Sequence, residues 1–416
     1  MTGGVHLNDA AWLEDGAITR LLALLDRDGE EARVVGGAVR NALMQLAVGE
    51  IDVATTAVPQ EVVRRAEAAG LKAVPTGVEH GTVTVVVDGR PFEVTTLRTD
   101  IETYGRKAKV EFGRDWKVDA ERRDFTINAL SASADGKVFD YVGGLADIAA
   151  RKVCFIGAPE QRIAEDYLRI LRFFRFHAHF GEGPPDPAGL LACIRARDGL
   201  ETLSRERVRM ELLKLVLAPH ATPALAVMAE AGILGTVLGG VPLLASFENV
   251  AKAEAAIGVE PDATRRLGAL GVSVMEDAER LSQRLRLSNA EFERMMAIEY
   301  WWRVTPAAGE HAAHVLLYQL GPASFTDRVL VAWSRSDAGA ADAAWRHLAG
   351  LPQRWTAPVF PLKAADFLSR GVPRGPEMGV ALRAAERAWV AADFPADRAA
   401  IDAIADRGAR EAKKSA

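Results

Sequence analysis

Strand-type and helix-type hydrophobic patterns occupy different parts of this chain of 416 residues. In residues 1–155, short apolar runs alternate with glycine-containing turns, and Asp88-Gly89 between two β-rich runs is a strong hairpin signal. From Pro159 onward, Ala-, Leu- and Arg-rich stretches with helical spacing dominate. The pattern predicts the α+β class: a head with a small mixed or antiparallel sheet, followed by an all-helical remainder.

The composition is that of a folded globular chain, with 49% hydrophobic and 26% charged residues. Its two cysteines, Cys154 and Cys193, lack CxxC spacing, which argues against a disulfide scaffold or a cysteine-ligated zinc site. Residues 1–16 lack a basic region followed by an apolar run, and no segment reaches the ~18 apolar residues of a membrane span. We therefore expect a cytoplasmic protein without membrane contact. The formal net charge of −5 means that any RNA contact must use local basic surfaces.

A glycine pair, Gly36-Gly37, stands between a predicted strand at residues 33–35 and a predicted helix at residues 38–46. Glycines at such a position let backbone N–H groups approach a phosphate at the helix N-terminus, where the helix dipole also favours an anion. The alternative is a simple chain reversal, which is what most glycine pairs provide.

Two acidic residues, Glu50 and Asp52, follow on a strand predicted at residues 50–54. Residues two apart in a strand point to the same face, so both carboxylates can address one Mg²⁺ site. A solvent-facing acidic strand edge is the ordinary alternative. A third carboxylate, Glu93, lies on a strand predicted at residues 91–97 and is either a further metal ligand or a cross-strand salt-bridge partner.

Two further segments combine arginine with carboxylate and amide groups. In residues 122–130, arginine is suited to phosphate and Asn or Asp to ribose hydroxyls, although a capped helix start is the alternative. Residues 165–176 predict one helix on which Asp166 and Arg169, three apart, share a face that Arg172 extends. Such a pair is suited to reading a base edge, whereas an intrahelical ion pair of about 0.3–0.5 kcal/mol is the alternative.

Taken in order, the stretches GGAVRN, EIDVATTA, RRDFTINAL and EDYLRILRFFRF resemble the class II tRNA nucleotidyltransferase and bacterial poly(A) polymerase family. This family is a branch of the polymerase-beta-like nucleotidyltransferases. Residues 205–238 look like its neck and residues 362–389 like its tail. The resemblance implies a head at 1–155, a neck with a base-recognition helix at 156–240, and a tRNA-binding body and tail at 241–416.

The resemblance also implies a role for each group of residues. Magnesium would be held by Glu50 and Asp52, with Glu93 as the third catalytic candidate. Gly36, Gly37 and Arg40 would face the triphosphate of the bound nucleotide. Arg123, Asp124 and Asn128 would bind its sugar and phosphates. Asp166, Arg169 and Arg172 would face the edge of its base. Family members usually carry Asp where this chain has Glu50, and often Asp where it has Asn41. The glutamate keeps the charge but reaches further.

Within the family, the choice lies between CCA addition to tRNA from CTP and ATP and addition of adenosine tails to RNA. Poly(A) polymerases carry a basic, Phe-containing stretch where this chain reads PTGVEHGTV at residues 75–83, which favours CCA addition. Poly(A) polymerase and a non-catalytic RNA-binding homologue remain the alternatives. No protein partner is evident. Dispersed basic residues are candidates for tRNA contact, although a solvated helix face is the commoner explanation for any one of them: Arg205, Arg207, Arg209, Lys214, Lys363, Arg370 and Arg374.

Overall fold

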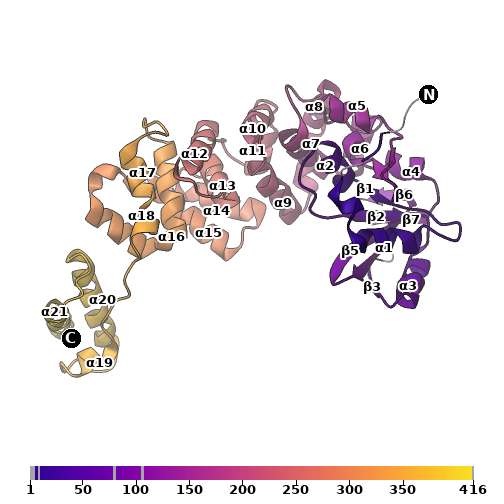
Figure 1. Cartoon of the computed structure of the whole chain (residues 1–416). Helices are drawn as coiled ribbons and strands as arrows, with labels where there is room; N and C mark the ends of the chain where they lie inside the picture. The colour runs from indigo at the N-terminus through magenta and orange to yellow at the C-terminus, as the bar shows by residue number, and fades with distance from the viewer. Residues whose placement is uncertain (1–4, 8–9, 78–80, 105–106, 415–416) are drawn as a thin grey trace. The chain divides into compact units, whose positions relative to one another are not determined.

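The computed structural model describes residues 5–7, 10–77, 81–104 and 107–414; for residues 11, 99–104 and 107–110 it describes the backbone alone. The chain forms two compact units, Met1–Gly239 and Gly240–Ala416. All strands of the described residues lie in the first unit, whereas the second is helical (Figure 1). The predicted α+β fold with a helical remainder is therefore confirmed. Among the described helices, none has the length and apolar character needed to cross a membrane.

A seven-stranded mixed sheet organises the first unit, in the order β3-β4-β5-β2-β1-β8-β9. The strands are β1 (Ala32–Val35), β2 (Asp52–Thr55), β3 (Lys72–Gly77), β4 (Thr82–Val87), β5 (Arg90–Thr96), β8 (Ser131–Ala132) and β9 (Val138–Phe139). Only the β2–β5 pair is parallel, and β6 (Arg98–Tyr104) and β7 (Lys107–Phe112) form a separate hairpin. At the β4–β5 turn, Asp88 and Gly89 have φ of 50° and 79°. Two positive φ values are what a tight hairpin turn requires, so the hairpin prediction is confirmed.

The two faces of the sheet are buried differently. On one face, α1 (Gly16–Leu25) and α3 (Pro59–Ala68) lie beside the sheet (Figure 1). Their apolar side chains and those of the sheet form one core. Val53 and Val94 belong to this core and are fully buried. Side chains alternate along a strand, so Asp52 and Glu93 project from the opposite face. That second face is covered only in part, by the small cluster around Trp116 of α4 (Trp116–Glu121).

Helix α2 (Gly37–Leu43) begins directly after β1, through a turn at Gly36. Gly36 has φ 68° and ψ −121°, which a residue with a side chain rarely adopts, and its N–H donates to the Leu130 carbonyl at 3.0 Å. The helix ends at Leu43, earlier than the predicted 46, because the chain turns at Gln45 with φ 57°.

The remaining helices of the first unit are α5 (Gly144–Ala149), α6 (Pro159–Glu165), α7 (Leu168–Phe180), α8 (Pro187–Ala196), α9 (Arg205–Val216), α10 (Ala221–Glu230) and α11 (Ile233–Leu238). The prediction of one helix across residues 165–176 is wrong, because α6 and α7 are separated at Asp166 and Tyr167. Asp166 is extended, with φ −158° and ψ 107°. The Asp166 side chain therefore projects from the break between α6 and α7.

Aromatic packing joins α7 to the segment after α4. The ring of Phe125 lies 4.8 Å from that of Phe155 and 5.3 Å from that of Phe176, and Phe155 stacks on Phe173 at 5.3 Å. Phe125 and Phe173 are fully buried. Burial of several aromatic rings contributes several kcal/mol, so this cluster fixes α7 against the segment that carries Asp124.

The second unit contains α12 (Leu244–Ile257), α13 (Ala263–Gly271), α14 (Met275–Leu285), α15 (Asn289–Glu299), α16 (Glu310–Ser334), α17 (Ala343–Ala349), α18 (Leu351–Arg354), α19 (Ala364–Leu368), α20 (Pro376–Ala391) and α21 (Arg398–Lys414). A buried ion network crosses its core. Asp327 accepts from Arg265 at 3.0 Å and from Arg294 at 2.6 Å, and Arg265 also donates to Glu254 at 2.7 Å. Each buried charge is thus paired, as a low-dielectric interior requires.

A substitution at the first glycine tests the turn into α2. We expect Gly36→Ala to destabilise the protein by about 1–3 kcal/mol, because alanine is strained at this φ and ψ. Its Cβ would also lie 3.3 Å from Nη1 of Arg123. Gly37→Ala is the matched control, since Gly37 is helical and a Cβ there meets only ordinary contacts. Equal urea midpoints for the two variants would contradict this account.

Candidate active site

Three carboxylates gather on the open face of the sheet. In the parallel β2–β5 pair Val53 lies opposite Val94, so Asp52 and Glu93, one position earlier, lie beside each other. Glu50 belongs to the loop before β2 and not to the strand, which corrects the prediction of a strand from residue 50. Ile51 between the two acids is buried, whereas Glu50, Asp52 and Glu93 are exposed. The three predicted acidic residues are therefore brought to one place.

The electrostatics of this cluster favour a cation. The pKa of Asp52 is raised, first by loss of water around the carboxylate and then by the negative charges of Glu93 and Glu50, while Arg123 opposes the shift. Carboxylates whose negative charges repel one another are stabilised by a bound cation, and carboxylate oxygens are the ligands that Mg²⁺ prefers. In the described part of the chain, no three His, Cys, Asp or Glu side chains are arranged to hold a metal by themselves. An ion here needs additional oxygen ligands.

A buried cation, Arg40, lies on the first turn after the glycines. It is 7% exposed, and burial together with the charge of Arg175 lowers its pKa to about 10. Its Nε and Nη2 donate to Oδ1 of Asn41 at 3.1 and 2.8 Å, and its Nη1 donates to Oδ1 of Asn128. Its guanidinium also lies 3.9 Å from the centre of the Phe180 ring. The hydrogen bonds of Arg40 thus end on amide oxygens, which do not neutralise its charge.

Asp124 connects the second and third sequence stretches. Its Oδ2 accepts from Nε of Arg172 at 2.7 Å, and its Oδ1 accepts from Nδ2 of Asn128 at 3.2 Å. Burial alone would raise the pKa of Asp124, but the charge and hydrogen bonds of Arg172 outweigh burial and lower it. The Asp124 carboxylate also accepts from the Phe125 N–H at 2.9 Å, but it does not cap a helix, because the short 3-10 helix at Thr126–Asn128 has Phe125 at its N-cap and no side-chain cap bond.

Arg123 lies between the glycine turn and the carboxylates. Its Nη2 pairs with the buried Asp119 at 3.1 Å, and its Nη1 donates to the Asn128 carbonyl at 3.4 Å. Its positive charge also opposes the rise in the pKa of Asp52. Hydrogen bonds to Asn128 therefore link Arg40 with Arg123 and Asp124, and the charge of Arg123 extends this linkage to Asp52.

Asp166 and Arg169 are held by other partners than predicted. Oδ2 of Asp166 accepts from Nη2 of Arg207 at 2.6 Å, and its Oδ1 accepts from the Leu168 N–H at 3.1 Å. Arg169 pairs with Glu165. Arg169 lowers the pKa of Asp124 and Asp166 raises that of Arg172, so both belong to the same electrostatic neighbourhood. The alternative of an Asp166–Arg169 ion pair is wrong.

Several residues of this region were not identified from the sequence. Glu211 of α9 is buried and pairs with Arg175 at 2.5 Å and with Arg172 at 3.8 Å. Arg172 and Arg175 are three apart on α7, a spacing that indicates a shared face. Arg207 appeared in sequence only as a tRNA-binding candidate. No local pattern indicates that it reaches Asp166.

Arg370 of the second unit, another tRNA-binding candidate, also has acidic partners. It pairs with Asp402 at 2.9 Å and with Asp406 at 2.8 Å. Its charge is therefore partly compensated within the chain.

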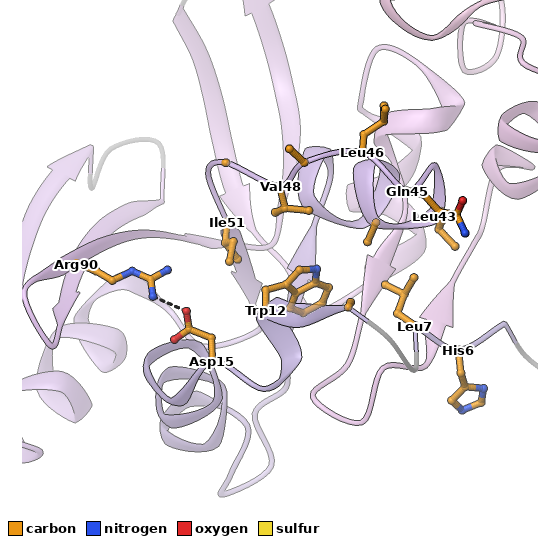
Figure 2. Close-up of a pocket in the computed structure, with 14 residues that line it drawn as sticks. His6, Leu7, Trp12, Asp15, Leu43, Gln45, Leu46, Val48, Ile51 and Arg90 are labelled. Atoms are coloured by element: carbon orange, nitrogen blue, oxygen red, sulfur yellow. Dashed lines mark hydrogen bonds and ion pairs between the residues drawn. The ribbon is translucent and has the colours of Figure 1, made fainter.

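A cavity of about 710 Å³ lies beside the loop that carries Glu50. Figure 2 shows Val48 and Ile51 of this loop among the residues that line the cavity, together with Trp12 and Leu7. Its lining includes neither Glu50 nor Asp52. The cavity therefore adjoins the loop without containing the carboxylates.

Comparison with known proteins identifies the family. Residues 32–154 match the model of the poly A polymerase head domain, and residues 186–247 match that of a probable RNA and SrmB-binding site of polymerase A. The mitochondrial CCA tRNA nucleotidyltransferases 1 of Mus musculus and Homo sapiens are each 33% identical over 384 residues, covering 89% of this chain and 85% of theirs. The chain belongs to the tRNA nucleotidyltransferase family.

A solved structure agrees with membership of the tRNA nucleotidyltransferase family. The CCA-adding enzyme of Bacillus stearothermophilus in complex with CTP superposes with a TM-score of 0.76 at 28% identity, covering 96% of this chain and 98% of that one. The likeness covers both units of the chain. The polymerase-beta-like head predicted from the four stretches is confirmed.

A pH series tests the Asp124–Arg172 pair. Because the folded pKa of Asp124 is lowered, its stabilising contribution is present above the unfolded pKa of about 3.8 and is lost as pH falls through the lower folded value. We expect Arg172→Gln to destabilise the protein at pH 7 by up to about 3 kcal/mol, the lower end for breaking a buried pair. The difference from the wild type should shrink below the unfolded pKa.

Thermal unfolding between pH 3 and 7 measures this difference. Arg195→Gln is the control, because the Arg195 side chain is 65% exposed and its ion pair with Glu160 is long, at 3.9 Å. The control should follow the wild type at every pH. A pH-independent loss in Arg172→Gln would show that Asp124 is not the group involved.

Proposed function

We propose that this tRNA nucleotidyltransferase adds CCA to the 3′ end of tRNA, using CTP and ATP and releasing pyrophosphate. One observation carries the proposal: the charge of Arg123 acts on Asp52 in the acidic cluster of Glu50, Asp52 and Glu93, and Arg123 is linked through Asn128 to the buried cation Arg40. A magnesium-bound triphosphate needs negative and positive groups in this arrangement. The similarity to the mouse and human CCA tRNA nucleotidyltransferases supports the substrate.

The carboxylates fit Mg²⁺, which commonly binds through one or two carboxylates plus substrate phosphates and water. In this proposal Glu50 and Asp52 are the ligands, and Glu93 completes the acidic wall. When bound, such ions activate the attacking 3′ hydroxyl and neutralise the departing pyrophosphate. The phosphate oxygens would supply the ligands that the protein itself lacks.

The remaining residues place the nucleotide. Backbone N–H groups after Gly36 and Gly37 receive the triphosphate at the start of α2, and Arg40 neutralises part of its charge. Arg123, Asp124 and Asn128 address the sugar and its phosphates. Catalysis then consists mainly of placement and electrostatic stabilisation.

Base selection is assigned to Asp166 and Arg169, with Arg172 beside them. A carboxylate accepts from an exocyclic amino group and a guanidinium donates to ring nitrogen or carbonyl oxygen, so the pair suits both cytosine and adenine. Asp166 has an extended backbone, and Arg207 donates to its carboxylate. The carboxylate therefore lies at a different place from that of an Asp inside a regular helix.

Besides the roles of the individual site residues and the magnesium ion, three further expectations stay predictions. Residues 78–80 of the stretch that argues against poly(A) polymerase lie outside the described residues. The boundaries of head, neck and body at residues 155 and 240 stay predictions as well. So does a cytoplasmic location, since the curated relatives include mitochondrial enzymes.

Incorporation of labelled CTP into a tRNA that lacks its CCA end tests the function directly. We expect two cytidines from CTP alone, completion by one adenosine when ATP is added, and no long tails from ATP alone on a generic RNA. Asp52→Ala should abolish incorporation while leaving the fold and most of the tRNA affinity intact, because it removes a proposed metal ligand. Tail synthesis would favour poly(A) polymerase, and full turnover by Asp52→Ala would refute the metal assignment.

The base-reading assignment has its own test. We expect Asp166→Ala and Arg169→Ala to reduce the ratio of correct to incorrect nucleotide incorporation by at least about tenfold, since a good bidentate contact contributes about 1–3 kcal/mol to discrimination. Competition between CTP, ATP, UTP and GTP on tRNA ending before CCA measures the ratio. Arg195→Ala is the exposed-arginine control. Unchanged selectivity in both variants would count against the assignment.

A further inference from the structure

The loop between α2 and β2, residues 44–51, leads directly into Glu50 and Asp52. One side of this loop borders the cavity of about 710 Å³, to which Val48 and Ile51 contribute (Figure 2). Leu46 is 43% exposed. Side-chain packing therefore covers the loop incompletely, and the conformation of the loop depends largely on its hydrogen bonds.

Asn41 makes hydrogen bonds that tie this loop to α2. Its backbone carbonyl accepts from the Leu46 N–H at 2.8 Å. Its side-chain Nδ2 donates to the Ala47 carbonyl at 2.9 Å. These bonds lie on either side of the peptide that follows Leu46, just after the turn at Gln45 with its positive φ. The positions of Leu46 and Ala47, from which the chain continues to Glu50, thus depend on Asn41.

The other end of the same amide orients Arg40. Oδ1 of Asn41 accepts from both Nε and Nη2 of Arg40, at 3.1 and 2.8 Å, which leaves Nη1 for Asn128. The chemistry demands an amide, since an acceptor must face the guanidinium and a donor must face the Ala47 carbonyl. An aspartate would supply only acceptors, and it would also neutralise Arg40.

We propose that Asn41 is a positioning residue that couples Arg40, on the triphosphate side, to the loop that places Glu50 and Asp52, on the metal side. The inference rests on the proposed roles of these three residues. It also joins the two positions at which this chain departs from the pattern that it resembles, because Asn41 anchors the start of the loop and Glu50 lies near its end. A glutamate reaches one methylene further than an aspartate, so the reach at residue 50 and the anchor at residue 41 must match.

The test compares Asn41→Asp, Glu50→Asp and the double variant in the full-length protein. Rates of CMP addition to tRNA lacking CCA give kcat, the KM for CTP and the Mg²⁺ concentration for half-maximal rate. We expect Asn41→Asp to lower kcat and raise the Mg²⁺ requirement by about tenfold each, because the loop loses its donor. The KM for CTP should also rise, because Arg40 is neutralised.

Coupling is read from the double variant. Residues that act as one unit are non-additive, so the combined loss should be clearly smaller than the product of the two single losses. Losses that simply multiply would overturn the proposal, and so would a wild-type kcat and Mg²⁺ requirement in Asn41→Asp. This comparison holds even if Asn41→Asp is less stable, because Glu50→Asp is measured in both backgrounds.

A binding measurement without turnover separates the two ends of the amide. The rise in melting temperature with CTP in EDTA reports the Arg40 side, and the further rise on adding Mg²⁺ reports the carboxylate side. Both increments should fall in Asn41→Asp, whereas unchanged increments would overturn the coupling.

Asn249→Asp is the matched control. The side chain of Asn249 also donates to a backbone carbonyl, that of Ser334 at 3.1 Å, but in the second unit. We expect this variant to keep the wild-type Mg²⁺ requirement and both increments; a parallel change would mean that loss of any such bond has the same effect, which would overturn the specific role of Asn41. A wild-type protein without CMP addition would sink the proposed function instead, so the two failures are distinguishable.

Discussion

The arrangement of the active site depends on one buried carboxylate, that of Asp124. A charge that is removed from water must be paired and hydrogen-bonded, or the folded state loses several kcal/mol. Asp124 meets this demand with Arg172 of α7 and with Asn128, whose own side-chain oxygen accepts from Arg40 of α2. Elements far apart in sequence are therefore tied through one anion. The Phe125 cluster beside it limits the access of water, which strengthens each of these bonds.

The same network separates charge within a chain whose formal net charge is only −5. Among the side chains that the structure describes, the acidic groups Glu50, Asp52 and Glu93 collect without a salt bridge, and Arg40, on the other side of Arg123 and Asn128, donates to amide oxygens and not to a carboxylate. Each side is less stable alone than it would be with a ligand of opposite charge. The protein thus holds its charges apart before any substrate arrives, and that preorganisation is what electrostatic catalysis requires.

Local pattern was sufficient where the responsible forces are local. Two β-rich runs predicted β4 and β5, and Asp88-Gly89 predicted the turn between them, because side-chain alternation and positive φ are properties of a few consecutive residues. The residue types at the site were also readable, since carboxylates two apart and glycines before a helix have a direct chemical meaning. Even the position of Glu93 beside Asp52 followed from strand periodicity once β2 and β5 were paired.

The failures have the opposite origin. Glu50 was placed on a strand because its spacing suits one, but β2 starts only where β1 offers partners, at Asp52. Asp166 has helical segments on both sides, yet the helix is interrupted there, and Arg207 of α9 donates a hydrogen bond to its carboxylate. The sequence marks Asn41 only as a departure from the pattern that it resembles and does not indicate its proposed role, because that role depends on a carbonyl six residues away and on a guanidinium that is itself fixed by Asn128. Such partners exist only after the chain has folded.

These long-range partners also explain how Asp166 can be fixed and still be available. A carboxylate has about four acceptor sites on its two oxygens. Arg207 occupies one on Oδ2 and the Leu168 N–H occupies one on Oδ1, so each oxygen keeps a lone pair for an amino group of a base. Arg207 balances the charge without using up the acceptors. In the proposed role, selectivity then comes from a carboxylate whose direction is set before the nucleotide binds, and little entropy remains to be lost on binding.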